Sequence, residues 1–129
     1  MSDVLPNLEA ALVKYLRDEL GVQVGTRVPA TRPASFIRLT RTGGAPLDRA
    51  QSRPTVLIEC WGSDETAAWS LASKAWPLLA SHRDGIRMGA VDVTTASLTD
   101  PVNYPDSATG TPRYQFIYSP IVITEGASL

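Results

Sequence analysis

Two stretches of the chain carry apolar residues at helical spacing. In residues 3–20, leucines recur every three or four positions and form one apolar stripe: Leu5, Leu8, Leu12, Leu16 and Leu20. Gly21 follows directly, where a helix often ends with a glycine. In residues 63–80, apolar side chains cover about half of the helix circumference. Ser63 is expected to cap this second helix, and Pro77 to kink or end it.

The remaining segments alternate between apolar and polar residues, which predicts strands. The predicted strands are residues 22–28, 35–42, 54–61, 86–97 and 113–124. In the third of them, Val56, Ile58 and Cys60 share one face. Pro120 cannot donate a ladder hydrogen bond, so the last strand is expected at an edge or bulged there.

The order of these elements is α-β-β-β-α-β-β, which predicts an α+β fold. We expect one domain over residues 1–129, with two helices packed on a mixed or antiparallel sheet of four to five strands. Residues 43–52 are expected to form the loop of a long β-hairpin arm, residues 98–112 a second long loop, and residues 125–129 a loose tail. The glycine pair at the start of the hairpin loop leads into a strand and lacks the GxxxxGK pattern, so it is not a phosphate loop.

Composition narrows the class of protein. The chain is 43% hydrophobic and 19% charged, as in ordinary globular domains, and no apolar run approaches the roughly 20 residues of a membrane span. Positive charge is concentrated in residues 27–53, which hold six arginines and one acid, whereas acids outnumber bases from Pro54 onward. This basic segment fits either a nucleic-acid surface or ion pairs to the acidic second half.

Little in the sequence points to catalysis. His82 is the only histidine and follows a predicted helix, where a structural role is more common than a catalytic one. Cys60 lies in the middle of a strand, as a small buried residue would. A chain with one histidine and one cysteine has no Cys/His metal cluster. We therefore expect that the protein is not an enzyme and that it binds no cofactor and no metal ion.

Three segments together resemble the tail terminator proteins of long-tailed bacteriophages, especially those of actinobacterial hosts. They are RVPATRPASFIRLTRTGG, DRAQSRPTVLIECWGSDETAAWSLA and GTPRYQFIYSPIVI, and the resemblance covers nearly the whole chain. It implies a small α+β subunit of the virion, assembled in the bacterial cytoplasm into a ring, usually a hexamer, at the neck end of the tail. Such a ring caps the tail tube protein, joins a head-completion or neck protein, and lets genomic DNA pass without specific binding.

Seven residues are candidates for contacts with neighbouring subunits or partners: Arg38, Arg41, Arg49, Arg53, Trp69, Trp76 and Arg113. Arg38 and Arg41 lie three apart on a strand and so project to opposite faces. Each tryptophan is expected to cover a sheet edge or to meet a neighbouring subunit. Two other functions stay open, a neck or head-closure connector of the same particle and a small host nucleic-acid-binding domain.

Overall fold

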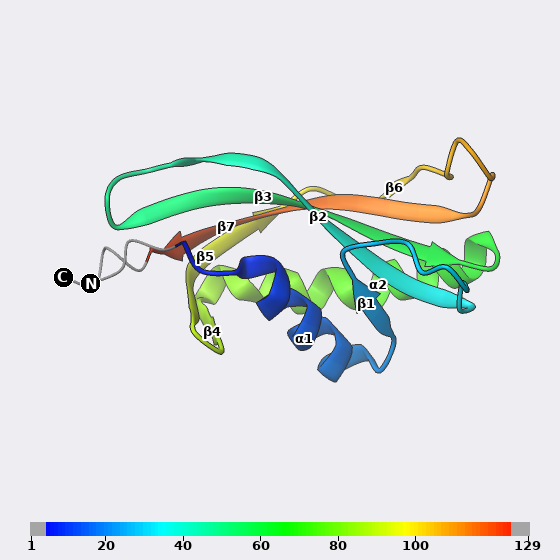
Figure 1. Ribbon diagram of the computed structural model, residues 1–129, viewed down its shortest axis with the longest axis horizontal. Helices are drawn as coiled ribbons and strands as arrows, with labels where there is room; N and C mark the ends of the chain where they lie inside the picture. The colour runs from blue at the N-terminus through cyan, green and yellow to red at the C-terminus, as the bar shows by residue number, and fades with distance from the viewer. Residues whose placement is uncertain (1–4, 125–129) are drawn as a thin grey trace.

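One curled, mixed β-sheet carries two helices on one of its faces (Figure 1). The computed structural model describes residues 5–124. In chain order the elements are α1 (Leu8–Leu20), β1 (Gln23–Gly25), β2 (Ser35–Pro46), β3 (Gln51–Gly62), α2 (Glu65–Ala80), the 3-10 helix η1 (Ser81–Asp84), β4 (Ile86–Met88), β5 (Val91–Leu98), β6 (Val102–Asn103) and β7 (Arg113–Ile123). The predicted tail, residues 125–129, lies outside the described residues.

The strand order is β1-β2-β3-β7-β5-β4, and β6 pairs with the part of β7 that β5 leaves unpaired. Among the strands of residues 5–124, β1 and β2 are the only pair that runs parallel. The α+β class and the order of the predicted elements are confirmed, but the predicted four to five strands are too few. Residues 86–97 fold into two strands, because Gly89 adopts a positive φ of 61° and forms a tight turn with Ala90. The predicted loop 98–112 contains β6.

The helices bury the apolar faces that the sequence pattern predicts. In α1 the buried positions are Leu8, Leu12 and Leu16, and Gly21 ends the helix with a left-handed φ of 66°. The helix begins later than predicted, because Asn7 caps it by accepting a hydrogen bond from the backbone N–H of Ala10. Together with α2 it packs on the sheet face that carries the following buried residues: Ile37, Leu39, Val56, Ile58, Cys60, Phe116 and Tyr118.

The structure corrects the predicted N-cap of α2 and one of the two outcomes predicted for Pro77, the end of the helix. Asp64, not Ser63, caps the helix, with its carboxylate 2.7 Å from the backbone nitrogen of Ala67. A carboxylate at this position also interacts favourably with the positive end of the helix dipole. Pro77 does not end the helix, which continues to Ala80.

Strand β7 lies in the interior of the sheet, between β3 and β5, so its predicted position at an edge is wrong. The β3–β7 ladder has the same register before and after a short break, and this register places Pro54 opposite Pro120. Neither proline has an N–H to donate, so the two strands share one gap in their ladder. An interior strand can hold Pro120 because the missing donors face each other.

The hairpin between β2 and β3 is mostly strand rather than loop. Its strands pair as far as Pro46 and Ser52, which leaves a short turn where a loop over residues 43–52 was predicted. The register shifts between Arg41 and Gly43, so Thr42 is the extra residue of a β-bulge. Beyond the bulge the hairpin extends past the helices (Figure 1). We call residues 42–53 the hairpin arm.

Gly62 lies where β3 meets α2 and leaves no room for a side chain. A Cβ added there would lie 2.4 Å from the backbone nitrogen of Ala68. We expect Gly62→Ala to lower the free energy of unfolding by about 1–3 kcal/mol, because the helix backbone must shift. A Cβ at Gly25 meets nothing within 4 Å. Gly25→Ala is the matched control, with a change in urea-unfolding free energy below about 1 kcal/mol; equal losses would contradict the steric explanation.

Candidate subunit interface

Two of the candidate arginines bind a buried glutamate of their own chain. Arg113 donates to Glu59 with an Nη1–Oε2 distance of 3.3 Å, and Arg38 lies 3.6 Å from the other carboxylate oxygen. The side chain of Glu59 is only 6% exposed and that of Arg113 only 10%. Arg113 is further held by the backbone carbonyl of Tyr104 and by Asp106. These charges are therefore neutralised inside the subunit, and Arg113 in particular is not free to meet a partner.

Trp61 lies beside this ion cluster on the sheet face opposite the helices. Its ring stacks on Phe36 at a centroid distance of 5.2 Å. The guanidinium groups of Arg32 and Arg113 lie over the Trp61 ring, 5.4 and 5.0 Å from its centroid. Arg32 also donates to Thr111 in the loop before β7. This cluster buries the end of β3 under two loops.

Glu59 and Trp61 are not among the residues that the sequence predicts for the interface. A signal was present, because Glu59 interrupts an otherwise apolar run, VLIECW. A carboxylate on a strand that is buried on both faces needs a cation from a neighbouring strand. The sequence does not say which cation, since Arg113 lies 54 residues away.

Arg41 projects to the helix side of the sheet, where it lies near Glu9 of α1, and Arg38 projects to the opposite side; their spacing predicted opposite faces. The guanidinium of Arg41 lies 3.8 Å from Glu9 on α1, and both side chains are about one-third exposed. Arg38, by contrast, faces the ion cluster on the other side. Arg38 and Arg41 thus both form ion pairs with acidic residues of their own chain. Neither arginine needs an acidic residue of a neighbouring subunit as its counter-ion.

Arg49 and Arg53 lie on the hairpin arm, and both are exposed. Neither forms an ion pair within residues 5–124. The arm that carries them has a free outer edge, because β1 pairs only with the stretch of β2 from Phe36 to Arg38. Beyond that stretch, the described chain provides no strand on the outer side of β2. Leu47 at the turn is 49% exposed.

The two candidate tryptophans have different environments. Trp69 is 48% exposed and touches Tyr114 with a ring-centroid distance of 5.2 Å. Trp76 packs against the core, and its indole N–H donates to the backbone carbonyl of Thr99 at 2.9 Å. Of these two tryptophans, Trp69 is therefore the one with a large exposed apolar surface.

The single histidine and the single cysteine of the chain are both buried. Nδ1 of His82 lies 2.7 Å from the hydroxyl of Tyr118, and burial lowers the pKa of His82 to about 4. Burial, with a smaller effect of Glu59, raises the pKa of the Cys60 thiol to about 12, which leaves it protonated and unreactive near neutral pH. Neither side chain is placed to meet a substrate in solution.

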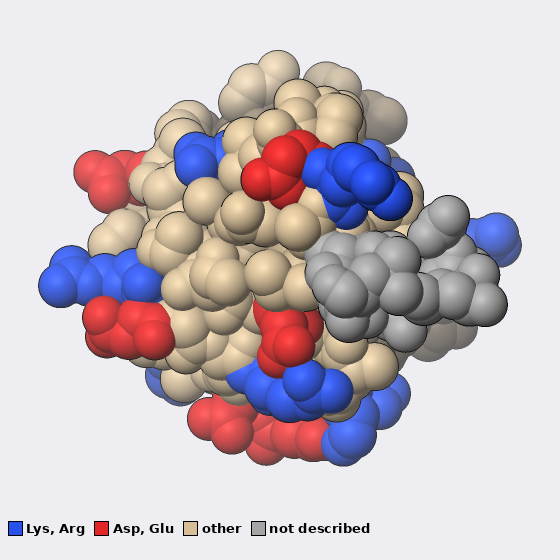
Figure 2. All heavy atoms as spheres, turned by 90° about the vertical axis from the view of Figure 1, so that its left-hand side faces the viewer, with Lys and Arg blue, Asp and Glu red and all other residues tan. Residues whose placement is uncertain are grey.

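The end of the molecule that carries the arm shows charges of both signs, interspersed around an uncharged area (Figure 2). Among residues 5–124, no three His, Cys, Asp or Glu side chains lie close enough together to hold a metal ion. No helix in this range is long and apolar enough to cross a membrane. In comparisons with known proteins, no family model and no curated protein matches the chain.

Proposed function

We propose that this chain is a structural subunit of a bacteriophage tail, a tail terminator that assembles into a ring. The observation that carries the proposal is the hairpin arm, which projects from the body with an unpaired strand edge. An exposed edge of this kind is a template for pairing with another chain unless something covers it. A subunit that works in a ring has a permanent neighbour to cover it.

The two sides of the subunit also differ, as a closed ring requires. The arm extends the sheet side, whereas α1 and α2 form the other side (Figure 1). A contact between unlike surfaces repeats from subunit to subunit and closes into a ring when the rotation allows it. We infer a homo-oligomer, with a hexamer expected from the family resemblance, that caps the tail tube protein and joins a head-completion or neck protein.

The use of the arginines favours this proposal over a nucleic-acid-binding domain. Arg38 and Arg113 are neutralised by Glu59, Arg41 is paired with Glu9, and Arg32 packs on Trp61. Phosphate binding needs cations that are free to displace counterions. Of the six arginines in residues 27–53, Arg27, Arg49 and Arg53 are exposed and form no ion pair within residues 5–124. Three free cations are few for tight binding to duplex DNA, so we expect genomic DNA to pass through the ring without specific contacts. A neck or head-closure connector would share this architecture and differ in its position in the particle.

The proposal is tested by native mass spectrometry and by electron microscopy of the purified chain with tail tubes. We expect a closed ring, uniform capped tubes, and weak or no binding to duplex DNA at physiological salt. Gold-labelled antibody should mark the neck end of the tail, between tube and head-completion protein; a label on the head side of that protein would favour the connector. A monomer that leaves tubes uncapped, or one that binds duplex DNA tightly, would refute the terminator function.

Trp69 and Trp76 give a matched pair for separating assembly from folding. We expect Trp69→Ser to reduce the fraction of chain in rings or on tubes, and to cost at most about 1 kcal/mol of stability for the lost Tyr114 contact. Trp76→Ser should lower the free energy of unfolding by about 3 kcal/mol, because it removes a core contact and a hydrogen bond. Native mass and urea unfolding of both variants provide the check. Full assembly of Trp69→Ser would remove Trp69 from the interface.

A further inference from the structure

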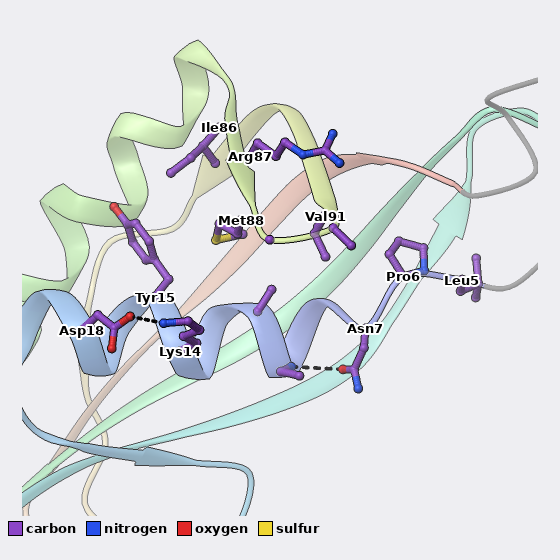
Figure 3. Close-up of a pocket in the computed structure, with 14 residues that line it drawn as sticks. Leu5, Pro6, Asn7, Lys14, Tyr15, Asp18, Ile86, Arg87, Met88 and Val91 are labelled. Carbon is purple, nitrogen blue, oxygen red and sulfur yellow. Dashed lines mark hydrogen bonds and ion pairs between the residues drawn. The ribbon is translucent and has the colours of Figure 1, made fainter.

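An open groove of about 770 Å³ runs between α1 and the β4–β5 hairpin (Figure 3). Its walls are mainly apolar and include Ala10, Ala11, Tyr15, Met88 and Val91. Leu5, 59% exposed, lies at the end of the groove where the chain enters α1. The groove is thus an apolar surface on the helix side of the molecule.

The charges at the groove are already paired with one another. Lys14 bonds Asp18 at 2.6 Å along α1, and Arg87 bonds Asp92 at 2.9 Å across the β4–β5 hairpin. An occupant therefore meets no free ion that it would have to neutralise. The remaining edge of β4 is unpaired among the described strands, since β4 pairs only with β5. A groove of this kind suits an uncharged extended segment with free backbone groups.

The hairpin arm contains such a segment. Residues 43–47, Gly-Gly-Ala-Pro-Leu, carry no charge and are all exposed. Their position is held by the turn, in which Asp48 accepts from the backbone N–H of Ala50 at 2.7 Å and Leu47 donates to the carbonyl of Gln51 at 2.9 Å. A segment that is ordered before it binds loses less entropy on binding.

We propose that the groove between α1 and β4 receives the hairpin arm of an adjacent copy of this chain, with Leu47 over Ala10 and Met88. The inference rests on the proposed ring function and assigns its subunit contact. The arm lies on the sheet side and the groove on the helix side of the same end of the molecule (Figure 1). Each subunit can therefore offer its arm to one neighbour and its groove to the other, which is the unlike contact that a ring repeats.

Disulfide cross-linking between two variants, each with one introduced cysteine, tests the contact. Leu47→Cys and Ala10→Cys both alter exposed positions, and the native Cys60 is fully buried. When the two variants are mixed and oxidised, we expect a covalent dimer that neither forms alone. The matched control mixes Leu47→Cys with Thr66→Cys, an exposed position at the start of α2. A dimer in the control, a dimer from Leu47→Cys alone, or no dimer in the test mixture would overturn the proposal.

A blocking variant provides an independent measurement. Ala10→Arg should fold, because the position is exposed, and should lower the fraction of chain in rings at least tenfold at a fixed concentration. If deletion of residues 1–4 or 125–129 increases the cross-linked yield, these termini compete for the groove, and the arm remains an occupant. Unchanged ring formation by Ala10→Arg would overturn the docking mode.

These experiments distinguish a failure of the arm-in-groove contact from a failure of the proposed terminator function. A ring by native mass without the Leu47–Ala10 cross-link refutes the docking mode alone. A cross-linked ring that leaves tail tubes uncapped refutes the terminator function alone. A chain that is monomeric with tubes present and gives no cross-link refutes both.

Discussion

Replacement of Glu59 by glutamine is expected to lower the free energy of unfolding by about 3 kcal/mol, because it leaves two arginines without their counter-ion. Arg113 is almost fully buried and keeps only Asp106 as an anionic partner, at 3.7 Å. Arg38 is about one-third exposed, so water screens part of its loss. The measurement is urea unfolding at neutral pH, with the midpoint and slope fitted together.

Asp92→Asn is the matched control for Glu59→Gln. It breaks the Arg87–Asp92 ion pair, which is similar in chemistry but about half exposed. Exposed pairs of this kind contribute less than about 1 kcal/mol. If the two substitutions lower the free energy of unfolding equally, the buried ion pairs of Glu59 stabilise the fold no more than an exposed ion pair does.

Acid is expected to destabilise the fold through His82. Burial lowers its pKa in the folded state to about 4, whereas an unfolded histidine titrates near 6.5. Between these values the unfolded state binds more protons, so stability falls as the pH falls. The contribution of His82 to the free energy of unfolding is fully present above pH 6.5. It decreases by about 3 kcal/mol as the pH approaches 4.

The histidine contribution can be separated from that of the carboxylates by comparing variants. His82→Gln should flatten the loss of unfolding free energy between pH 6.5 and 4 relative to the wild type. Tyr118→Phe removes the hydroxyl beside Nδ1 but keeps the buried imidazole, which also contacts Tyr15. This control should be less stable at every pH and keep the steep dependence. If His82→Gln has the same slope as the wild type, His82 is not the group that responds to acid.

The local patterns of the sequence predicted the two helices, the order of the main elements and which residues of the main strands share a face. The leucine repeat of α1 and the alternation in β3 and β7 predict which residues share a face, because helical and extended backbones repeat every 3.6 and 2 residues wherever they lie in the fold. The same alternation places Arg38 and Arg41 on opposite faces, as the structure confirms.

The local patterns did not predict which segments lie next to each other in the folded sheet. The sequence suggested an edge or bulge for Pro120, but in an interior strand it is tolerated because Pro54 lies opposite. The residues 43–52 have the Gly, Pro and Asp content of a loop, yet most of them pair as strands, since the returning strand β3 extends further than its apolar run. Only the assembled sheet supplies these partners.

For the candidate interface residues, too, the sequence and the tertiary structure each determine different properties. The sequence by itself determined that arginines are concentrated in residues 27–53 and that two tryptophans lie on α2, but not which of them are used inside the subunit. Tertiary structure decided that Arg113 reaches Glu59 across 54 residues and that Trp76 reaches Thr99, while Arg49, Arg53 and Trp69 stay exposed. Periodicity follows from the local backbone, whereas the pairing of a charge or an indole depends on residues that only the folded chain brings within a few ångströms.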